Sequence, residues 1–340
     1  MAQQKVKYTD TERTPAERAR ALLEEMTLDE KMAQLGCIFP FGDSYDDMEQ
    51  QALEMPYGIG QVSTLEMRRI RTLEEAAGWQ RKMQETVMRQ SPHHIPAIFH
   101  MEGLCGAFIQ EGTSFPSGIA RGSGWDPELE EKIAKVVAKQ EAACGITHIL
   151  APVLDISRDS RMGRQGETYG EDPALAAALG TAYTKGIQTT EAGGRRPESV
   201  AKHFLGFHNS QGGIHGTNSD TPSRLMEEIY GKPFQSAISE SGLKGVMPCY
   251  NSIDGEPASV SHRLLTELLR EKMGFDGLCV SDYGGINNAH EVQRIGETIG
   301  ETGLLAMEAG MDIEMPKATG YGEELKEMFR SGQADTELLD

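Results

Sequence analysis

The sequence predicts an α/β protein of the (β/α)8 barrel type. Helical and strand-like segments alternate along the chain, and the strand-like segments are short, continuous apolar runs. Such strands are buried on both faces, as in parallel sheets, and alternation over this length favours a barrel over an open nucleotide-binding sheet. Neither GxGxxG nor a Walker A pattern marks a nucleotide site. About seven strands are recognisable, so one barrel strand is expected to be irregular or missing.

In the first half of the chain, apolar periodicity and capping signals define the elements. Thr27, with Glu30 three residues later, is a candidate helix N-cap, and Pro127 suits the first position of a helix. Helices are expected over 14–36, 72–90, 126–144 and 172–188. Strands are expected over 58–64, 95–102 and 147–157.

The second half continues the alternation after a strand at 199–204. A polar, glycine-rich loop is expected over 205–222. Strands are then expected over 243–251, 277–285 and 311–316, and helices over 224–241, 261–273, 298–310 and near 322–331.

Composition limits the function classes. The 340 residues carry 33 Lys and Arg against 52 Asp and Glu, so the formal charge is 33 − 52 = −19. A charge of this sign repels nucleic acid and anionic membranes, and neither is expected as a partner. There is no apolar run of membrane-spanning length, and the first 20 residues lack a secretory apolar core, which favours a cytoplasmic location.

The five cysteines favour reduced, mostly buried thiols. Their number is odd, their spacing is wide and no CxxC pair occurs, so neither disulfides nor a cysteine zinc site is expected. They are Cys37, Cys105, Cys144, Cys249 and Cys279.

Several predicted strands end in polar residues. Because the carboxyl ends of barrel strands meet on one face, these side chains should converge there. Carboxylates together with Lys, His and Arg suit a neutral, polyhydroxylated ligand. The residues are Glu102, Asp155, Lys202, His203, Tyr250, Asn251 and Asp282.

Long motifs around these positions resemble glycoside hydrolase family 3. They run in the family's order from about residue 15, as FPSGIARGSGWDPEL (115–129), LAPVLDISRDSRMGRQGETYGEDP (150–173), AKHFLGF (201–207), GVMPCYNSIDGEP (245–257), GFDGLCVSDYGGI (274–286) and AMEAGMDIEMP (306–316). The resemblance covers the family's N-terminal barrel, here 1–340 with a helical lead-in over 1–26. It implies that the α/β-sandwich domain that follows the barrel in most members is missing, as in a truncated chain.

The resemblance implies a retaining, exo-acting β-glycosidase for terminal β-D-glucosyl or β-D-xylosyl residues, without cofactor or metal. Asp282 matches the nucleophile that forms a covalent glycosyl ester, and Tyr250 the tyrosine whose hydroxyl orients it. From position alone, Asp282 could instead cap a helix. The residues that match sugar-binding positions are Glu102, Arg164, Lys202 and His203. Arg158 and Arg161 are expected to pair with Asp155, Asp159 or Glu167.

Four positions depart from the family pattern. Glu102 stands where the glucosidases usually carry Asp, and its extra methylene would occupy the space of a hexose C6 group, which favours a pentose. Cys105 replaces His, Met162 replaces Trp, and Tyr283 replaces Trp after the nucleophile. Tyr283 can still stack on a sugar face.

The acid/base is the open part of the prediction. In most members a Glu of the sandwich domain supplies it, so that domain is an expected partner in cis or in trans. A subset of N-acetylglucosaminidases uses a loop His, and His215 lies near that place, but the usual Asp two residues earlier is Gly213. His208 and His215 are therefore expected to be loop or subsite residues.

Two other classes remain. One is a non-catalytic sugar-binding or assembly fragment of a divided enzyme. The other, a metal- or phosphate-dependent barrel, has no ligand-spaced cluster to support it. A barrel face left open by a missing domain would expose apolar surface and promote homo-oligomers.

Overall fold

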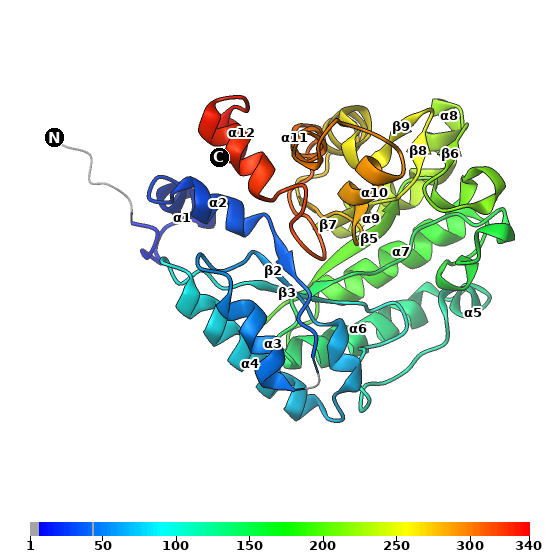
Figure 1. Cartoon of the computed structure of the whole chain (residues 1–340). Helices are drawn as coiled ribbons and strands as arrows, with labels where there is room; N and C mark the ends of the chain where they lie inside the picture. The colour runs from blue at the N-terminus through cyan, green and yellow to red at the C-terminus, as the bar shows by residue number, and fades with distance from the viewer. Residues whose placement is uncertain (1–6, 43) are drawn as a thin grey trace.

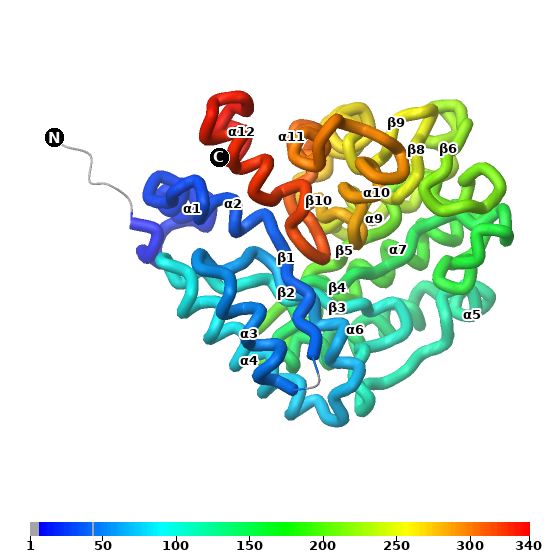
Figure 2. Tube along the Cα trace, in the orientation of Figure 1, coloured from blue at the N-terminus to red at the C-terminus, as the bar shows by residue number. Residues whose placement is uncertain are grey.

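The computed structural model describes residues 7–42 and 44–340, so residues 1–6 of the expected lead-in lie outside it. Its central sheet has seven strands in the order β1-β2-β3-β4-β5-β7-β10, all paired in parallel, with helices around it (Figures 1 and 2). The strands are β1 Cys37–Ile38, β2 Gln61–Ser63, β3 Ile98–Met101, β4 His148–Ile149, β5 Glu198–Phe204, β7 Gly245–Pro248 and β10 Leu278–Cys279.

The sheet closes into a ring through an irregular eighth position. Ile313 forms a parallel bridge with Val280, beside β10. On its other side, the Glu314 N–H donates to the Leu35 carbonyl at 2.9 Å, just before β1. The predicted barrel with one irregular strand is confirmed. The expected strand 311–316 is reduced to this bridge, while the two-residue β1 was missed because so short a segment has no readable period.

Most predicted helices are present, and the differences have local causes. The expected helical stretch 14–36 is two helices, and the predicted N-cap at Thr27 is confirmed, because Thr27 has extended φ/ψ and its side chain caps α2 together with Glu30. The expected helix 224–241 is interrupted by π-helical turns over Met226–Tyr230, and α9 starts anew at Lys232 with Pro233 in its first turn, a position that proline tolerates.

The helices are listed here by their bounds. They are α1 Pro15–Leu23, α2 Leu28–Gln34, α3 Tyr45–Leu53, α4 Leu73–Gln90, α5 Gly118–Gly122, α6 Pro127–Ala143, α7 Pro173–Gln188, α8 Ser223–Leu225, α9 Lys232–Ser241, α10 Gly285–Glu291, α11 Ile299–Ala309 and α12 Glu323–Ser331, with a π-helix at Arg263–Lys272. The sequence did not predict α3, α5 or α10. The predicted loop 205–222 contributes a strand to a small second sheet of β6 Asn218–Ser219, β8 Ser252–Ile253 and β9 Glu256–Pro257.

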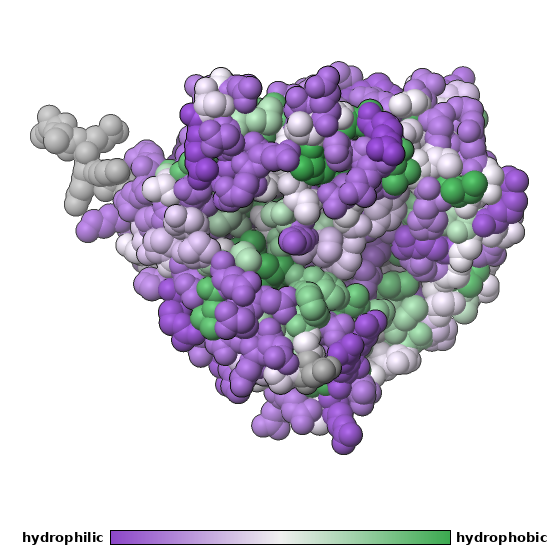
Figure 3. Space-filling model, viewed as in Figure 1, coloured by the Kyte–Doolittle hydropathy of each residue, from purple (hydrophilic) through white to green (hydrophobic). Residues whose placement is uncertain are grey.

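The barrel interior is a packed layer of apolar side chains. Residues from strands on opposite sides of the ring contact one another there, and they are Cys37, Leu150, Val200, Met247, Val280, Ile313 and Met315. The five cysteines are free, as predicted. Polar side chains cover most of the face seen in Figure 3, with hydrophobic residues gathered near its centre.

The C-terminal end of the chain packs beside α2, near its beginning. In Figure 1, α12 (red) lies next to α2 (blue). The Arg330 guanidinium donates to Asp29 at 2.6 Å, and Lys31 pairs with Asp340. Among the described residues, no helix is long and apolar enough to cross a membrane.

Candidate active site

Asp282 follows β10 and presents one uncommitted carboxylate oxygen. Its Oδ1 accepts a hydrogen bond from the Tyr283 N–H at 2.7 Å. Its Oδ2 is buried and has no hydrogen-bond partner among the described residues. Because buried polar atoms are nearly always hydrogen-bonded in native proteins, an orphaned oxygen at a strand end indicates a functional role.

Burial and the neighbouring polar groups have opposite effects on the pKa of Asp282. Burial raises the pKa of Asp282 above its usual value, while Lys202, the Tyr283 N–H, Arg164 and Tyr250 lower it. The two cations therefore oppose the effect of burial on this carboxylate. A carboxylate held this way can act as a nucleophile near neutral pH.

Lys202 and Glu102 form a nearly buried ion pair beside this carboxylate. Lys202 lies on β5 and Glu102 directly after β3, and Lys202 Nζ is 2.6 Å from Glu102 Oε2. The Lys202 side chain is 4% exposed and that of Glu102 is 23% exposed. The pair therefore opens to solvent on the Glu102 side, where a polar ligand can reach it.

His203 is held between Asp155 and Arg164. Its Nδ1 is 2.7 Å from Asp155 Oδ2, and its Nε2 is 3.2 Å from Arg164 Nη2. Because a guanidinium only donates, we assign Nε2 as the acceptor and place the proton on Nδ1, facing Asp155. Burial and Arg164 lower the pKa of His203, which agrees with a neutral ring. The same Nε2 lies 3.7 Å from Asp282 Oδ2.

Arg164 is fixed by a second carboxylate. Its Nε and Nη2 donate to the two oxygens of Glu167 at 2.7 and 2.8 Å, and the guanidinium lies over the Phe207 ring, 5.2 Å from its centroid. Bidentate pairs of this kind fix orientation as well as charge. Arg164 thus reaches His203 and Asp282 from a loop between β4 and α7.

Tyr250 lies beside the segment that carries Asp282. Its hydroxyl donates to the Tyr283 carbonyl at 2.8 Å. Burial and then the Asp282 carboxylate raise the pKa of Tyr250, and the Tyr250 hydroxyl in turn lowers the pKa of Asp282. That this hydroxyl orients the carboxylate directly stays a prediction. Tyr250 and the Tyr283 N–H together hold the segment that carries Asp282.

Tyr283 is anchored by two residues that the sequence did not single out. Its hydroxyl lies 2.7 Å from Ser63 Oγ on β2 and 2.8 Å from His100 Nε2 on β3. His100 in turn contacts Gln61 at 2.8 Å. Because alternate residues of a strand share a face, the position of His100 two residues before Glu102 was the signal that it faces the site.

Removing the Tyr283 hydroxyl should destabilise the barrel measurably. Tyr283→Phe leaves Ser63 Oγ and His100 Nε2 without this partner, and burying unpaired polar atoms costs about 1–3 kcal/mol. We expect urea unfolding to show a loss of that size. Tyr57→Phe, at a half-exposed tyrosine, is the control and should change the free energy of unfolding little. Equal stability of the two variants would contradict the anchoring role.

The two loop histidines border the cluster but make no carboxylate contact. His208 is buried, which lowers its pKa to about 4. His215 is exposed, and its ring lies 5.1 Å from that of Phe207 and 6.1 Å from that of Tyr250. Burial and Arg164 lower the pKa of His215. The Glu167 carboxylate opposes this lowering at both imidazoles, but it forms no ion pair with either of them and is already paired with Arg164.

The expected arginine pairings are only partly correct. Arg161 donates to Asp159 with a shortest distance of 2.6 Å, as predicted. Asp155 and Glu167, however, serve His203 and Arg164, and Arg158 has no ion pair with any described residue. The prediction paired Asp155 with arginines nearby in the sequence, but Asp155 meets His203 through the pairing of neighbouring strands. In the described part of the chain, no group of three His, Cys, Asp or Glu is placed to hold a metal.

Known proteins match this chain in sequence and in fold. A beta-xylosidase of Formosa agariphila is 35% identical over 230 residues, which are 65% of this chain and 32% of that protein. A beta-glucosidase of Rhizobium radiobacter is 36% identical over 67% of this chain and 26% of its own length. A β-glucosidase structure from Erythrobacter marinus superposes with a TM-score of 0.90 at 30% identity, covering 98% of this chain and 44% of the other.

A second solved structure is the Listeria innocua beta-glucosidase in complex with glucose. It superposes with a TM-score of 0.85 at 28% identity, and the match covers 96% of this chain and 45% of the Listeria chain. The chain thus spans less than half the length of these relatives. The family described as "Glycosyl hydrolase family 3 N terminal domain" matches residues 27–340. With the barrel and the cluster around Asp282, this match shows that the chain belongs to glycosyl hydrolase family 3.

Proposed function

We propose that the barrel is the nucleophile-bearing domain of a retaining, exo-acting β-glycosidase that removes terminal β-D-glucosyl or β-D-xylosyl residues. The observation that carries the proposal is Asp282 Oδ2, a buried carboxylate oxygen with no described hydrogen-bond partner, 3.7 Å from His203 and beside Lys202 and Arg164. The relatives named as beta-glucosidases and beta-xylosidases support the substrate class.

In the proposed reaction, Asp282 Oδ2 forms a bond to the anomeric carbon while the bond from that carbon to the aglycone oxygen breaks. The leaving oxygen takes a proton from a general acid. Water then displaces Asp282 from the glycosyl ester and gives its proton to the same group. The Tyr283 N–H, bound to Oδ1, keeps the carboxylate in place through both steps.

The proton donor is proposed to lie outside the cluster described here. Retaining hydrolysis needs two carboxyl groups about 5–5.5 Å apart. The other carboxylates beside Asp282 already have basic partners, since Glu102 pairs with Lys202, Asp155 with His203, and Glu167 with Arg164. We therefore propose that a sandwich domain, in cis or in trans, supplies the acid.

Covalent trapping tests the proposal directly. An activated 2-fluoro glucoside or 2-fluoro xyloside with a dinitrophenyl leaving group needs little acid assistance, so it should label the protein at Asp282. Intact-protein mass spectrometry should show one glycosyl adduct, and peptide mapping should place it on Asp282. An unlabelled protein would favour the non-catalytic sugar-binding or assembly fragment. Turnover of a nitrophenyl N-acetyl-β-D-glucosaminide in place of the glucoside and xyloside would favour the loop-His enzyme.

Glu102 is proposed to set the preference between pentose and hexose. Shortening it by one methylene in Glu102→Asp should open space for a C6 hydroxymethyl group. Because one methylene in a pocket changes discrimination by about 10–200-fold, the glucoside-to-xyloside ratio of kcat/KM should rise at least tenfold. Paired nitrophenyl glucoside and xyloside assays measure this. Glu256→Asp, at a partly exposed residue away from the cluster, is the control, and an unchanged ratio in Glu102→Asp would contradict the proposal.

A further inference from the structure

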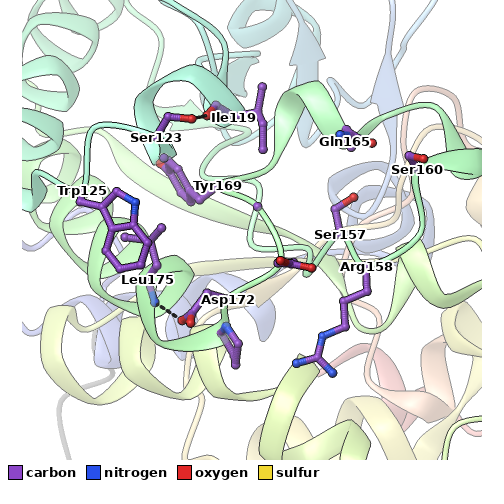
Figure 4. Close-up of a pocket in the computed structure, with 14 residues that line it drawn as sticks. Ile119, Ser123, Trp125, Ser157, Arg158, Ser160, Gln165, Tyr169, Asp172 and Leu175 are labelled. Atoms are coloured by element: carbon purple, nitrogen blue, oxygen red, sulfur yellow. Dashed lines mark hydrogen bonds between the residues drawn. The ribbon is translucent and has the colours of Figure 1, made fainter.

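A pocket of about 840 Å³ lies beside the barrel mouth, between α5, the start of α7 and the segment 157–173 that connects β4 to α7 (Figure 4). None of the residues assigned above to the cluster around Asp282 lines it. The segment 157–173 nevertheless connects the pocket with the cluster around Asp282, because its Arg164 contacts His203 and the adjacent Gln165 lines the pocket. A volume of this size is typical of small-molecule sites, which occupy about 300–1,000 Å³.

Most of the polar side chains that line this pocket are free to bind a ligand. Within the part of the chain that the structure describes, no hydrogen bond or ion pair engages five of the polar side chains that line it, namely Ser157, Arg158, Ser160, Gln165 and Glu171. They offer donors through the guanidinium and the amide, and acceptors through the carboxylate, the amide oxygen and the hydroxyls. Such a mixture fits a neutral ligand that both donates and accepts.

Trp125 supplies an aromatic surface to the same pocket. It is 67% exposed, whereas Trp79, the other tryptophan of the chain, is 8% exposed. Its φ of 53° is uncommon for a bulky residue. Trp125 and Arg158 stand on opposite sides of the pocket in Figure 4, so a ligand between them can meet a flat apolar face and a polar one.

We propose that this pocket is a second carbohydrate site, which takes a β-linked oligosaccharide chain and holds it beside the catalytic mouth. Sugar rings combine an apolar face, which would stack on Trp125, with hydroxyls that would bond Arg158, Gln165 and Glu171. The two carboxylates Glu171 and Asp172 against one Arg158 disfavour an anion. The inference deepens the proposed function and rests on it for the class of sugar.

Tryptophan fluorescence can report this site selectively, because Trp125 is the more exposed of the two tryptophans. In an Asp282→Asn background, which prevents turnover, cellotetraose or xylotetraose should shift the emission to the blue and protect it from acrylamide quenching. Trp125→Ala should remove the shift, and calorimetry should show one of two binding events lost. Arg158→Ala should weaken the same event at least fivefold, whereas Arg196→Ala, at another exposed arginine, should not.

The outcomes separate this inference from the proposed function. Nitrophenyl glycosides are too short to need the pocket, so their turnover should be equal in Trp125→Ala and in the parent protein. Unchanged fluorescence, or equal tetrasaccharide affinity with and without Trp125, would overturn the second site even if trapping at Asp282 succeeds. Binding at Trp125 without any adduct at Asp282 would support the second site and refute the glycosidase.

Discussion

Asp282→Asn should lower the turnover of an activated dinitrophenyl β-glycoside by about four orders of magnitude or more. Asn keeps the shape of the side chain and can still accept from the Tyr283 N–H, but its amide cannot form the glycosyl ester. Losing the attacking group of a covalent mechanism typically costs about 10⁴–10⁶ in kcat. Initial rates of dinitrophenolate release measure the effect for glucoside and xyloside alike.

The matched control for this substitution is Asp276→Asn. Asp276 lies six residues earlier, just before β10, and its side chain is 80% exposed. The same chemical change should leave the rate within about twofold there. A rate for Asp282→Asn within tenfold of the parent, with an unchanged circular dichroism spectrum, would show that Asp282 is not the nucleophile.

Lys202→Met should be the second most damaging change. Met fills a similar volume but removes the charge that faces both Glu102 and Asp282. Loss of one preorganised charged donor in an active site typically costs about 10²–10³ in kcat. We expect a loss of this size in kcat/KM for both the nitrophenyl glucoside and the xyloside.

A pH profile distinguishes this electrostatic role from a structural one. Lys202 lowers the pKa of Asp282, so its removal should raise that pKa further. Because only the carboxylate form attacks, kcat/KM should begin to fall at a higher pH on acidification than in the parent. The control is Lys244→Met, at a half-exposed ion pair with Asp276, which should leave the acid limb in place. An acid limb that does not move would contradict a direct interaction between Lys202 and Asp282.

The positions of the functional side chains at the strand ends were predictable from the topology of a parallel barrel. Parallel strands place their carboxyl ends on one face, so an apolar run that ends in Glu102, Lys202-His203 or Asp282 marks the site without knowledge of the loops. The long helices α4, α6 and α7 were predictable for a similar reason, since their capping signals and apolar periodicity are local. The short elements β1, β6, β8, β9, α3, α5 and α10 carry too little periodicity for this and were missed.

The hydrogen-bond partners of the site residues could not be predicted from the local sequence. Asp155 was expected to meet a nearby arginine, yet it binds His203, 48 residues away, because neighbouring barrel strands bring the two together. The Tyr250 hydroxyl donates to the Tyr283 backbone carbonyl, and the Tyr283 hydroxyl contacts Ser63 and His100 on β2 and β3.

The chain's own residues thus determined the barrel, the face that carries its chemistry and the charged side chains that gather there, because these depend on local periodicity and on one topological rule. Only the tertiary structure decided which charge faces which, that Asp282 keeps one oxygen unbound, and that Trp125 borders a separate polar pocket. Those outcomes depend on distances between segments far apart in sequence, which are set when the sheet closes and which no local pattern encodes.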